Sequence, residues 1–466
     1  MKRDLTQGNV TKTMLLFAGP MILGNLLQQC YNIADTLIVG RFLGPNALAA
    51  VGSAYTLMTF LTSIIIGLCM GSGAVFSVYF GKKEVLQMKK CMLASFLFVA
   101  MVTVLLTVLV FALIDPILGI LQVPESVYGL MRDYVWIIFF GIGFVFLYNY
   151  FAYLMRALGN SLVPLCFLGV AAVLNIVLDI LFVVGFQMGV KGAALATVIA
   201  QAASSMGIGA YTWIREAELR PGRGAEILRL SVGVLTDQAV IGEVIRNSAA
   251  ACVQQSVMNF GILMIQGLVN SFGPVVMAAF AAAVKIDSFA YMPAQEFGNA
   301  FSLFISQNHG GGKQERVRQG MLRAAAVSVS FCLVISAGIF VLAPYLMRIF
   351  VDAGETAIIQ TGVGYLRVEG AFYCGIGLLF LLYGFYRGVE KPEMSLVLTI
   401  LSLGTRVLLA YLLSPIPEIG VWGIWWAIPI GWFLADLVGI TCIRKISGYS
   451  ILKKYDGSRI VKMNHE

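Results

Sequence analysis

Apolar residues fall into long stretches separated by short polar gaps, and this pattern determines the class of the protein. A helix needs about 20 apolar residues to cross the hydrocarbon core of a membrane, and every stretch reaches that length. We therefore predict an all-α polytopic membrane protein with twelve transmembrane helices, over residues 13–40, 47–79, 89–114, 133–155, 162–186, 191–214, 247–271, 275–305, 320–345, 357–386, 394–415 and 421–443.

The basic residues between these stretches predict the orientation of the chain. Alternate gaps, counted from the N-terminus, hold most of the lysines and arginines, including Lys82, Lys83 and the cluster after residue 443. The opposite gaps and helix ends hold only Arg41, Arg132, Lys191, Arg348 and Arg367. Since cytoplasmic loops carry an excess of lysine and arginine, we expect a multi-pass protein of the cell (plasma) membrane with both termini in the cytoplasm.

The two halves of the chain repeat each other. Gly44-Pro45 recurs as Gly273-Pro274, and Gly189-Val-Lys-Gly192 recurs as Gly420-Val-Trp-Gly423. Six helices in each half keep the same orientation, so two six-helix lobes are related by a pseudo-two-fold axis along the membrane normal. The predicted parts are an N-lobe (1–214), a charged cytoplasmic linker with a surface helix (215–246), a C-lobe (247–445) and a cytoplasmic tail (446–466).

Composition excludes several function classes. The chain has 466 residues, of which 59% are hydrophobic and only 12% charged, about half the charge of a soluble protein. The net charge of +8 lies in loops, so we expect contact with the bilayer and none with nucleic acid. The eight cysteines form no C-x-x-C pair, and no nucleotide-binding loop or nucleophile motif occurs. We expect no cofactor and no enzymatic activity, with an ion gradient as the driving force.

Polar residues inside the predicted N-lobe helices are the candidate site. A carboxylate in a spanning helix costs about 2.5–3.5 kcal/mol, so it usually faces water or a partner. Asp35 is one such residue, and Asn175 and Asp179 share one face of a later helix, with Thr197 on the next. The corresponding C-lobe positions are Met264, Arg406, Ala410 and Ile428, so only one lobe carries this oxygen-rich set. Its ligands suit Na⁺ or a shared proton.

Two other features of the helices admit more than one interpretation. Pro20 frees a backbone carbonyl and offers a place to bend, although passive kinks are common. The C-lobe charges have opposite signs and predict either internal pairing or a role in coupling and substrate contact. This C-lobe charge network comprises Lys285, Asp287, Glu296, Glu369, Arg406 and Asp436.

Taken together, these motifs resemble the multidrug and toxic compound extrusion (MATE) family, and specifically its DinF-like branch. The resemblance covers almost the whole chain and rests on the order and spacing of several short motifs. They are Pro20 with Gln28, Tyr31, Asn32 and Asp35; Gly40 to Gly44 with Ala49 to Gly52; Arg156 to Asn160; Asn175 to Asp179; Gly192 to Thr197; and Gln307 to Lys313.

The resemblance implies a monomeric antiporter that exports amphipathic, cationic or aromatic small molecules in exchange for H⁺ or Na⁺. It places the cation site at Asp35, Asn175, Asp179 and Thr197, the bend of the first helix at Pro20, and the substrate pocket at Gln28, Tyr31 and Asn149. The sequence departs from the family at residues 248–250, Ser-Ala-Ala, where members often have a proline. Another branch carries C-lobe acids in segments seven and ten, and the middle of segment ten here, residues 375–382, is uncharged.

Two other functions stay open at this point. A flippase for lipids or lipid-linked oligosaccharides belongs to the same superfamily, but such proteins usually have extra helices and a basic central cavity. A membrane enzyme acting on lipids would need a nucleophile–base pair, and the sequence shows none that we can place.

Overall fold

The computed structural model describes residues 4–120, 123, 125–216 and 237–443, and nearly all of them are helical. The first half consists of α1 (Val10–Leu43), α2 (Pro45–Lys82), α3 (Val85–Ile120), α4 (Glu125–Phe139), α5 (Ile142–Ala157), α6 (Leu162–Asp179), the π-helix η1 (Ile180–Gly185) and α7 (Val190–Arg215). The second half consists of α9 (Gln238–Asn270), α10 (Pro274–Gly310), α11 (Gln314–Phe350), α12 (Thr356–Ala371), α13 (Tyr373–Gly388), α14 (Pro392–Leu413) and α15 (Val421–Ile443).

The predicted twelve-helix membrane protein is confirmed. Within the described residues, ten helices are long and apolar enough to span a membrane, and two bent pairs complete the twelve. The pairs are α4–α5, bent by 44°, and α12–α13, bent by 52°. Each is the fourth span of its lobe, and the sequence read each as one continuous stretch. No proline lies at either break, so neither bend could be predicted from a proline in the sequence.

The region between the lobes differs from the prediction in one respect. Helix α9 begins at Gln238, so residues 238–246 continue into a spanning helix of the second lobe. Asp237 caps this helix, because its side chain accepts a hydrogen bond from the backbone N–H of Val240. Residues 217–236 and 444–466, which hold the rest of the predicted linker and the predicted tail, lie outside the described residues.

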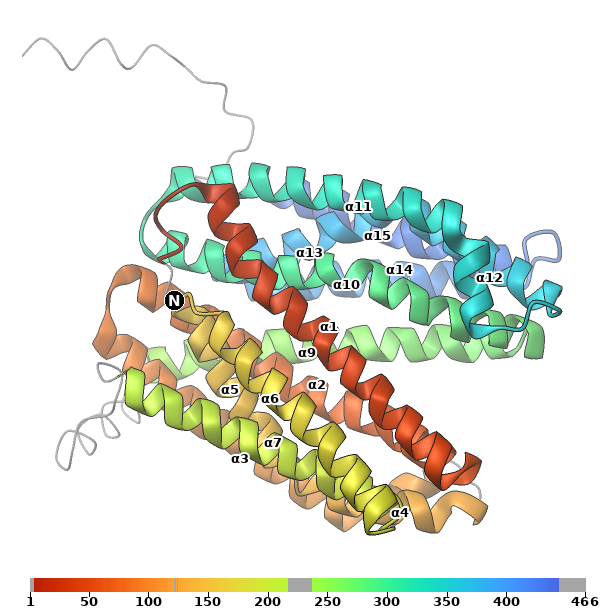
Figure 1. The fold of residues 1–466 in the computed structure, drawn as a ribbon. Coiled ribbons are helices and arrows are strands. Elements are labelled where there is room, and N and C mark those ends of the chain that lie inside the picture. Colours follow the sequence, from red (N-terminus) through yellow and green to blue (C-terminus); the bar gives the residue numbers. More distant parts are fainter. Residues whose placement is uncertain (1–3, 121–122, 124, 217–236, 444–466) are drawn as a thin grey trace, which may run out of the picture.

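The two lobes lie side by side and diverge toward the end of the bundle where α1 ends (Figure 1). At the opposite end, α2 of the first lobe packs along α9 and α10 of the second. Glycines permit this approach: a Cβ atom on Gly67 would lie 2.6 Å from the Cα atom of Cys252. Similar contacts with the main chain surround Gly71, Gly81 and Gly310. We call this region, where the lobes meet through small residues, the closed end.

The segment before α1, residues 4–8, is fastened to the closed end. The backbone N–H of the fully buried Leu5 donates to Gln307 Oε1 at 3.1 Å. Arg316 donates to three carbonyls of the segment, at distances of 2.6–3.1 Å for its two terminal nitrogens. Gln307 also donates to the carbonyl of Ala157 in the first lobe, at 2.6 Å. The segment therefore shares its anchor with a contact between the lobes.

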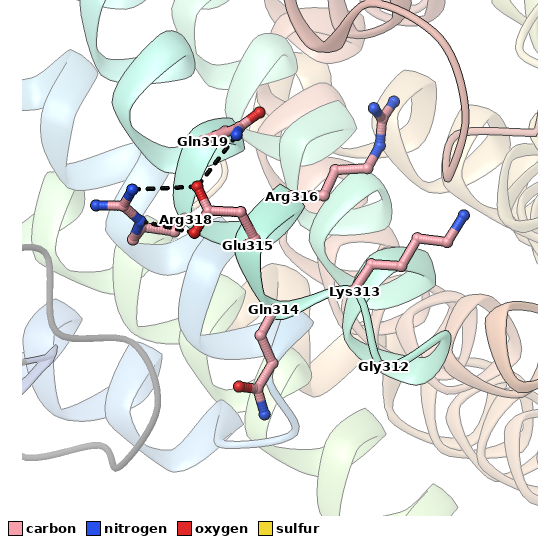
Figure 2. Close-up of a pocket in the computed structure, with 7 residues that line it drawn as sticks. All are labelled: Gly312, Lys313, Gln314, Glu315, Arg316, Arg318 and Gln319. Atoms are coloured by element: carbon pink, nitrogen blue, oxygen red, sulfur yellow. Dashed lines mark hydrogen bonds and ion pairs between the residues drawn. The ribbon is translucent and has the colours of Figure 1, made fainter. Parts of the chain in front are cut away.

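Figure 2 shows how the turn between α10 and α11 presents these groups. Arg318 and Gln319 both donate to Glu315 on one side of the turn, while Lys313 and Arg316 extend to the other side. Lys313 Nζ donates to the carbonyl of Thr6 at 2.7 Å. The wide hollow of about 690 Å³ beside the turn is therefore lined by side chains already engaged in structural contacts.

Helix α1 is continuous through Pro20, with unbroken helical assignment from Val10 to Leu43. The proline lies between the buried residues Ala18 and Met21, which pack in the core of the second lobe. The bend of this helix at Pro20 during transport stays a prediction.

Candidate functional site

A cavity of about 380 Å³ lies among the helices of the first lobe, on the side that faces the second. Six of the residues singled out from the sequence line it. They are Gln28, Tyr31 and Asp35 of α1, Asn149 of α5, Asn175 of α6 and Thr197 of α7. Four different helices thus bring the predicted cation ligands and the predicted substrate-pocket residues to one place.

The two acids of the candidate cation site are neighbours. Asp179 is fully buried behind the cavity wall and interacts electrostatically with Asp35, which lines the cavity. Neither oxygen of Asp179, nor Oδ1 of Asp35, accepts a hydrogen bond from any residue that the structure describes. Two carboxyl groups this close in a poorly hydrated setting repel each other when both are ionised, so a proton or a cation between them is stabilising.

The amide and the hydroxyl complete the same group. Asn175 Nδ2 donates to Thr197 Oγ1 at 3.2 Å, and Thr197 Oγ1 donates to the carbonyl of Ala193 at 3.1 Å. This leaves Asn175 Oδ1 without a donor among the described residues. The side chains of Asp35, Asn175 and Asp179 therefore supply four buried oxygen atoms that no described group satisfies. Each such atom costs about 1–3 kcal/mol unless a ligand compensates for it.

A local change in helix type follows directly after Asp179. Helix α6 ends at this residue and continues as the six-residue π-helix η1. The corresponding helix of the second lobe, α14, remains α-helical from Pro392 to Leu413. Short π-helical turns are uncommon and occur frequently at functional sites. The backbone asymmetry between the lobes thus coincides with the asymmetry in acidic side chains.

Sequence reasoning missed much of the cavity wall. Residues from α1, α2, α4, α5 and α7 supply further hydroxyl and amide groups, and two amides come from α9 of the second lobe. These additional polar lining residues are Asn32, Tyr55, Thr59, Thr62, Ser63, Tyr134, Tyr148, Gln201, Ser204, Gln255 and Asn259. Threonine and serine in spanning helices commonly bond to their own backbone, so their identity alone did not point to a pocket.

The lining has a definite electrostatic character. Among the described residues it contains one carboxylate, Asp35, and neither lysine nor arginine. Four tyrosine rings, Tyr31, Tyr55, Tyr134 and Tyr148, contribute aromatic surface. Aromatic faces attract cations and stack on flat rings, so this lining is suited to aromatic or positively charged molecules.

The C-lobe charges form one cluster and several separate groups. Asp287 accepts a hydrogen bond from Tyr373 at 2.5 Å and interacts electrostatically with Glu369 and Arg406. No described carboxylate lies within ion-pair distance of Arg406, so the predicted pairing is electrostatic and not a direct salt bridge.

The other residues of the predicted C-lobe charge network lie outside the cluster around Asp287. Glu296 accepts hydrogen bonds from Asn25 of α1, at 3.0 Å, and from Asn299, at 3.2 Å. Asp436 is buried, with both oxygens unbonded within the described part of the chain, and Lys285 is exposed. The six residues therefore do not form a single network, and their role in transport stays a prediction.

A second polar group joins the lobes at the closed end. Tyr79 OH of α2 donates to Glu243 Oε2 of α9 at 2.7 Å, and this contact links the two lobes. His309 Nε2 and Glu390 Oε2, both of the second lobe, lie 3.4 Å apart. The hydrogen bond from His309 lowers the pKa of Glu390, which lies in the turn before α14. No group of three or more histidine, cysteine, aspartate or glutamate side chains in the described residues could hold a metal ion.

Comparison with known proteins agrees with this architecture. The sequence model of the MatE family matches twice, over residues 20–181 and 250–412, once in each lobe. The chain is 32% identical over 399 residues to "Probable multidrug resistance protein YpnP" of Bacillus subtilis, covering 86% of this chain and 87% of that protein. It is 25% identical over 436 residues to "Probable multidrug resistance protein YoeA" of the same organism, covering 92% of each.

The fold has a close counterpart among solved structures. A structure described as "Crystal structure of MATE in complex with MaL6" superimposes with a TM-score of 0.86 at 21% sequence identity, covering 97% of this chain and 99% of that one. The predicted fold class is therefore confirmed. The match to the MatE family model and the similarity to multidrug resistance proteins confirm the prediction of a transporter rather than an enzyme. The more specific assignment to the DinF-like branch stays a prediction. Two matched repeats and a relative sharing nearly a third of its residues show that the chain belongs to the MatE family of membrane transporters.

Proposed function

We propose that the protein exports small amphipathic molecules by exchanging them for H⁺ or Na⁺ that binds at Asp35, Asn175, Asp179 and Thr197. The observation that carries this proposal is the group of four buried, donor-free oxygens beside a cavity. A positive ion would satisfy all of them at once. The names of the multidrug resistance relatives support the export of drug-like molecules.

The character of the cavity supports aromatic or cationic substrates. A cation bound in the cavity would interact with the Asp35 carboxylate and with the tyrosine rings. The flippase alternative requires binding of a phosphorylated lipid headgroup, and no described lining residue supplies a positive charge for it. Export of a drug-like molecule is the function that this lining favours.

The conformation suggests where the structure lies in the transport cycle. We propose that both termini are cytoplasmic, as the basic residues predict, with residues 1–214 and 247–445 forming the N-lobe and C-lobe. The closed end then faces the cytoplasm and the cavity faces the opposite side of the membrane. In this outward-open state the coupling ion would enter from outside the cell. Its binding would shift the balance between the states only by its differential affinity for them.

Transport by purified protein in liposomes tests the proposal. We expect export of ethidium to accelerate when an inward pH gradient or an inward Na⁺ gradient is imposed, each applied separately with the membrane potential clamped. The gradient that accelerates export identifies the coupling ion. Export at the same rate with neither gradient, with either one and with both would contradict coupled antiport.

A further inference from the structure

A groove on the lipid-facing side of the second lobe, far from the cavity, has the chemistry of a binding site. It measures about 620 Å³ and lies between α11, α12 and α15. Its walls are mostly apolar and aromatic, with exposed Phe340 on one side and exposed Trp422 and Trp426 on the other. One cationic side chain, Arg367 of α12, lies in this apolar wall.

Arg367 lacks an anionic partner within the described chain. Its Nε donates a hydrogen bond to the carbonyl of Phe340 at 3.4 Å, and the centre of the Phe340 ring lies 5.2 Å from the guanidinium carbon. None of the described salt bridges includes it. The side chain is exposed on a surface that borders lipid, where an uncompensated charge is costly.

The position of Arg367 along its span indicates what could neutralise it. Helices α12 and α13 together make one broken span from Thr356 to Gly388, roughly 50 Å of helix, against a hydrocarbon core of about 30 Å. Arg367 lies about 16 Å along the helix from Thr356, roughly a third of the way through this bent span and close to the hydrocarbon boundary. An arginine at this depth extends its guanidinium to the headgroup level, where phosphate groups lie. Tryptophans, which favour this interface, lie in the same groove.

We propose that this groove binds one glycerophospholipid, with its phosphate on the Arg367 guanidinium and an acyl chain along the aromatic wall. Guanidinium and phosphate match in geometry and charge, and the paired hydrogen bonds that they form are strong. The acyl chain would cover the rings of Phe340, Trp422 and Trp426. This site is independent of the proposed antiport, since no residue lining the groove lines the cavity.

Native mass spectrometry of the purified full-length protein tests the proposal. Dioleoyl-phosphatidylglycerol is titrated into wild type, R367Q, R367K and R348Q, with dioleoylglycerol as the phosphate-free probe. Arg348 is the matched control, because it is also exposed, lies near the end of α11 and, among the described residues, has its guanidinium carbon 6.0 Å from the centre of the Tyr345 ring. We expect R367Q to bind one phosphatidylglycerol about tenfold more weakly and R348Q to match wild type. R367K should bind with an affinity between those of R367Q and wild type, because it keeps the charge but loses the paired hydrogen bonds.

Two results would overturn the proposal. One is equal phosphatidylglycerol binding by wild type and R367Q, both of which must elute as single folded species. The other is binding of dioleoylglycerol as tight as that of phosphatidylglycerol, which would show that the phosphate is not recognised. Neither result would bear on export, so a failure here is distinguishable from a failure of the proposed antiport.

Discussion

Replacing Asp179 with asparagine is expected to reduce gradient-driven export by about tenfold or more, within the range of typical coupling between two sites. The substitution keeps the shape of a fully buried side chain but removes the charge that the proposed cation neutralises. Without that charge, the cation loses its differential affinity for the outward-open state and no longer shifts the equilibrium. The measurement is ethidium export from proteoliposomes under the gradient that drives wild type.

Asp436 provides the matched control for this experiment. It is also a buried aspartate with both carboxylate oxygens lacking a donor in the described chain, but it lies in the second lobe and, unlike Asp179, does not interact with Asp35. The D436N variant should therefore retain most of the gradient-driven rate. If D179N exported at the wild-type rate, the N-lobe assignment would be wrong. Equal losses in D179N and D436N would instead place coupling in both lobes.

Replacing Gly67 with leucine is expected to lower export to less than about a tenth of the wild-type rate, because the closed end could no longer form. A side chain at this position would meet the main chain of Cys252 across the closed end, at 2.6 Å from the Cβ position. The main chain cannot move aside as a side-chain tip could, so the lobes would no longer meet. Overpacking costs about 1–3 kcal/mol, which shifts the balance between open and closed arrangements by roughly 5- to 150-fold.

The same substitution at Gly52 controls for the effect of leucine on α2. A Cβ atom at Gly52 meets nothing within 4 Å, and the residue is exposed. G52L should therefore export ethidium at close to the wild-type rate, and G67L at less than about a tenth of it, when both elute as single folded species. Wild-type export by G67L would show that the close contact between α2 and α9 is not needed in the cycle.

The sequence singled out N-lobe residues that the structure brings together, because charged side chains inside a membrane are rare and costly. An aspartate is costly at any position inside a membrane. The presence of Asp35 and Asp179 on two helices of one lobe therefore indicated that they belong to one site. The spacing of Asn175 and Asp179 placed both on one helix face, and the structure brings Thr197 to the same point. The lobe repeat was equally visible, since glycine and proline at helix boundaries recur in order.

Other features could not be predicted, for physical reasons that differ from case to case. The bends at residues 140–141 and 372 occur without a proline at either break, the residue type that most often marks a kink. The amides of Gln255 and Asn259 reach the cavity only because α9 packs against α2. The segment at residues 4–8 has no pattern of its own, and its place depends on side chains some three hundred positions away.

The central claim is that a positive ion occupies the carboxyl pair and leaves when substrate binds. The most direct measurement adds ethidium to purified protein and records cation release, with a pH indicator in weak buffer and with a Na⁺-sensitive probe. We predict that wild type releases H⁺ or Na⁺ as ethidium binds, and that D179N binds ethidium without release. Binding of ethidium to wild type with no release of either ion would contradict the account.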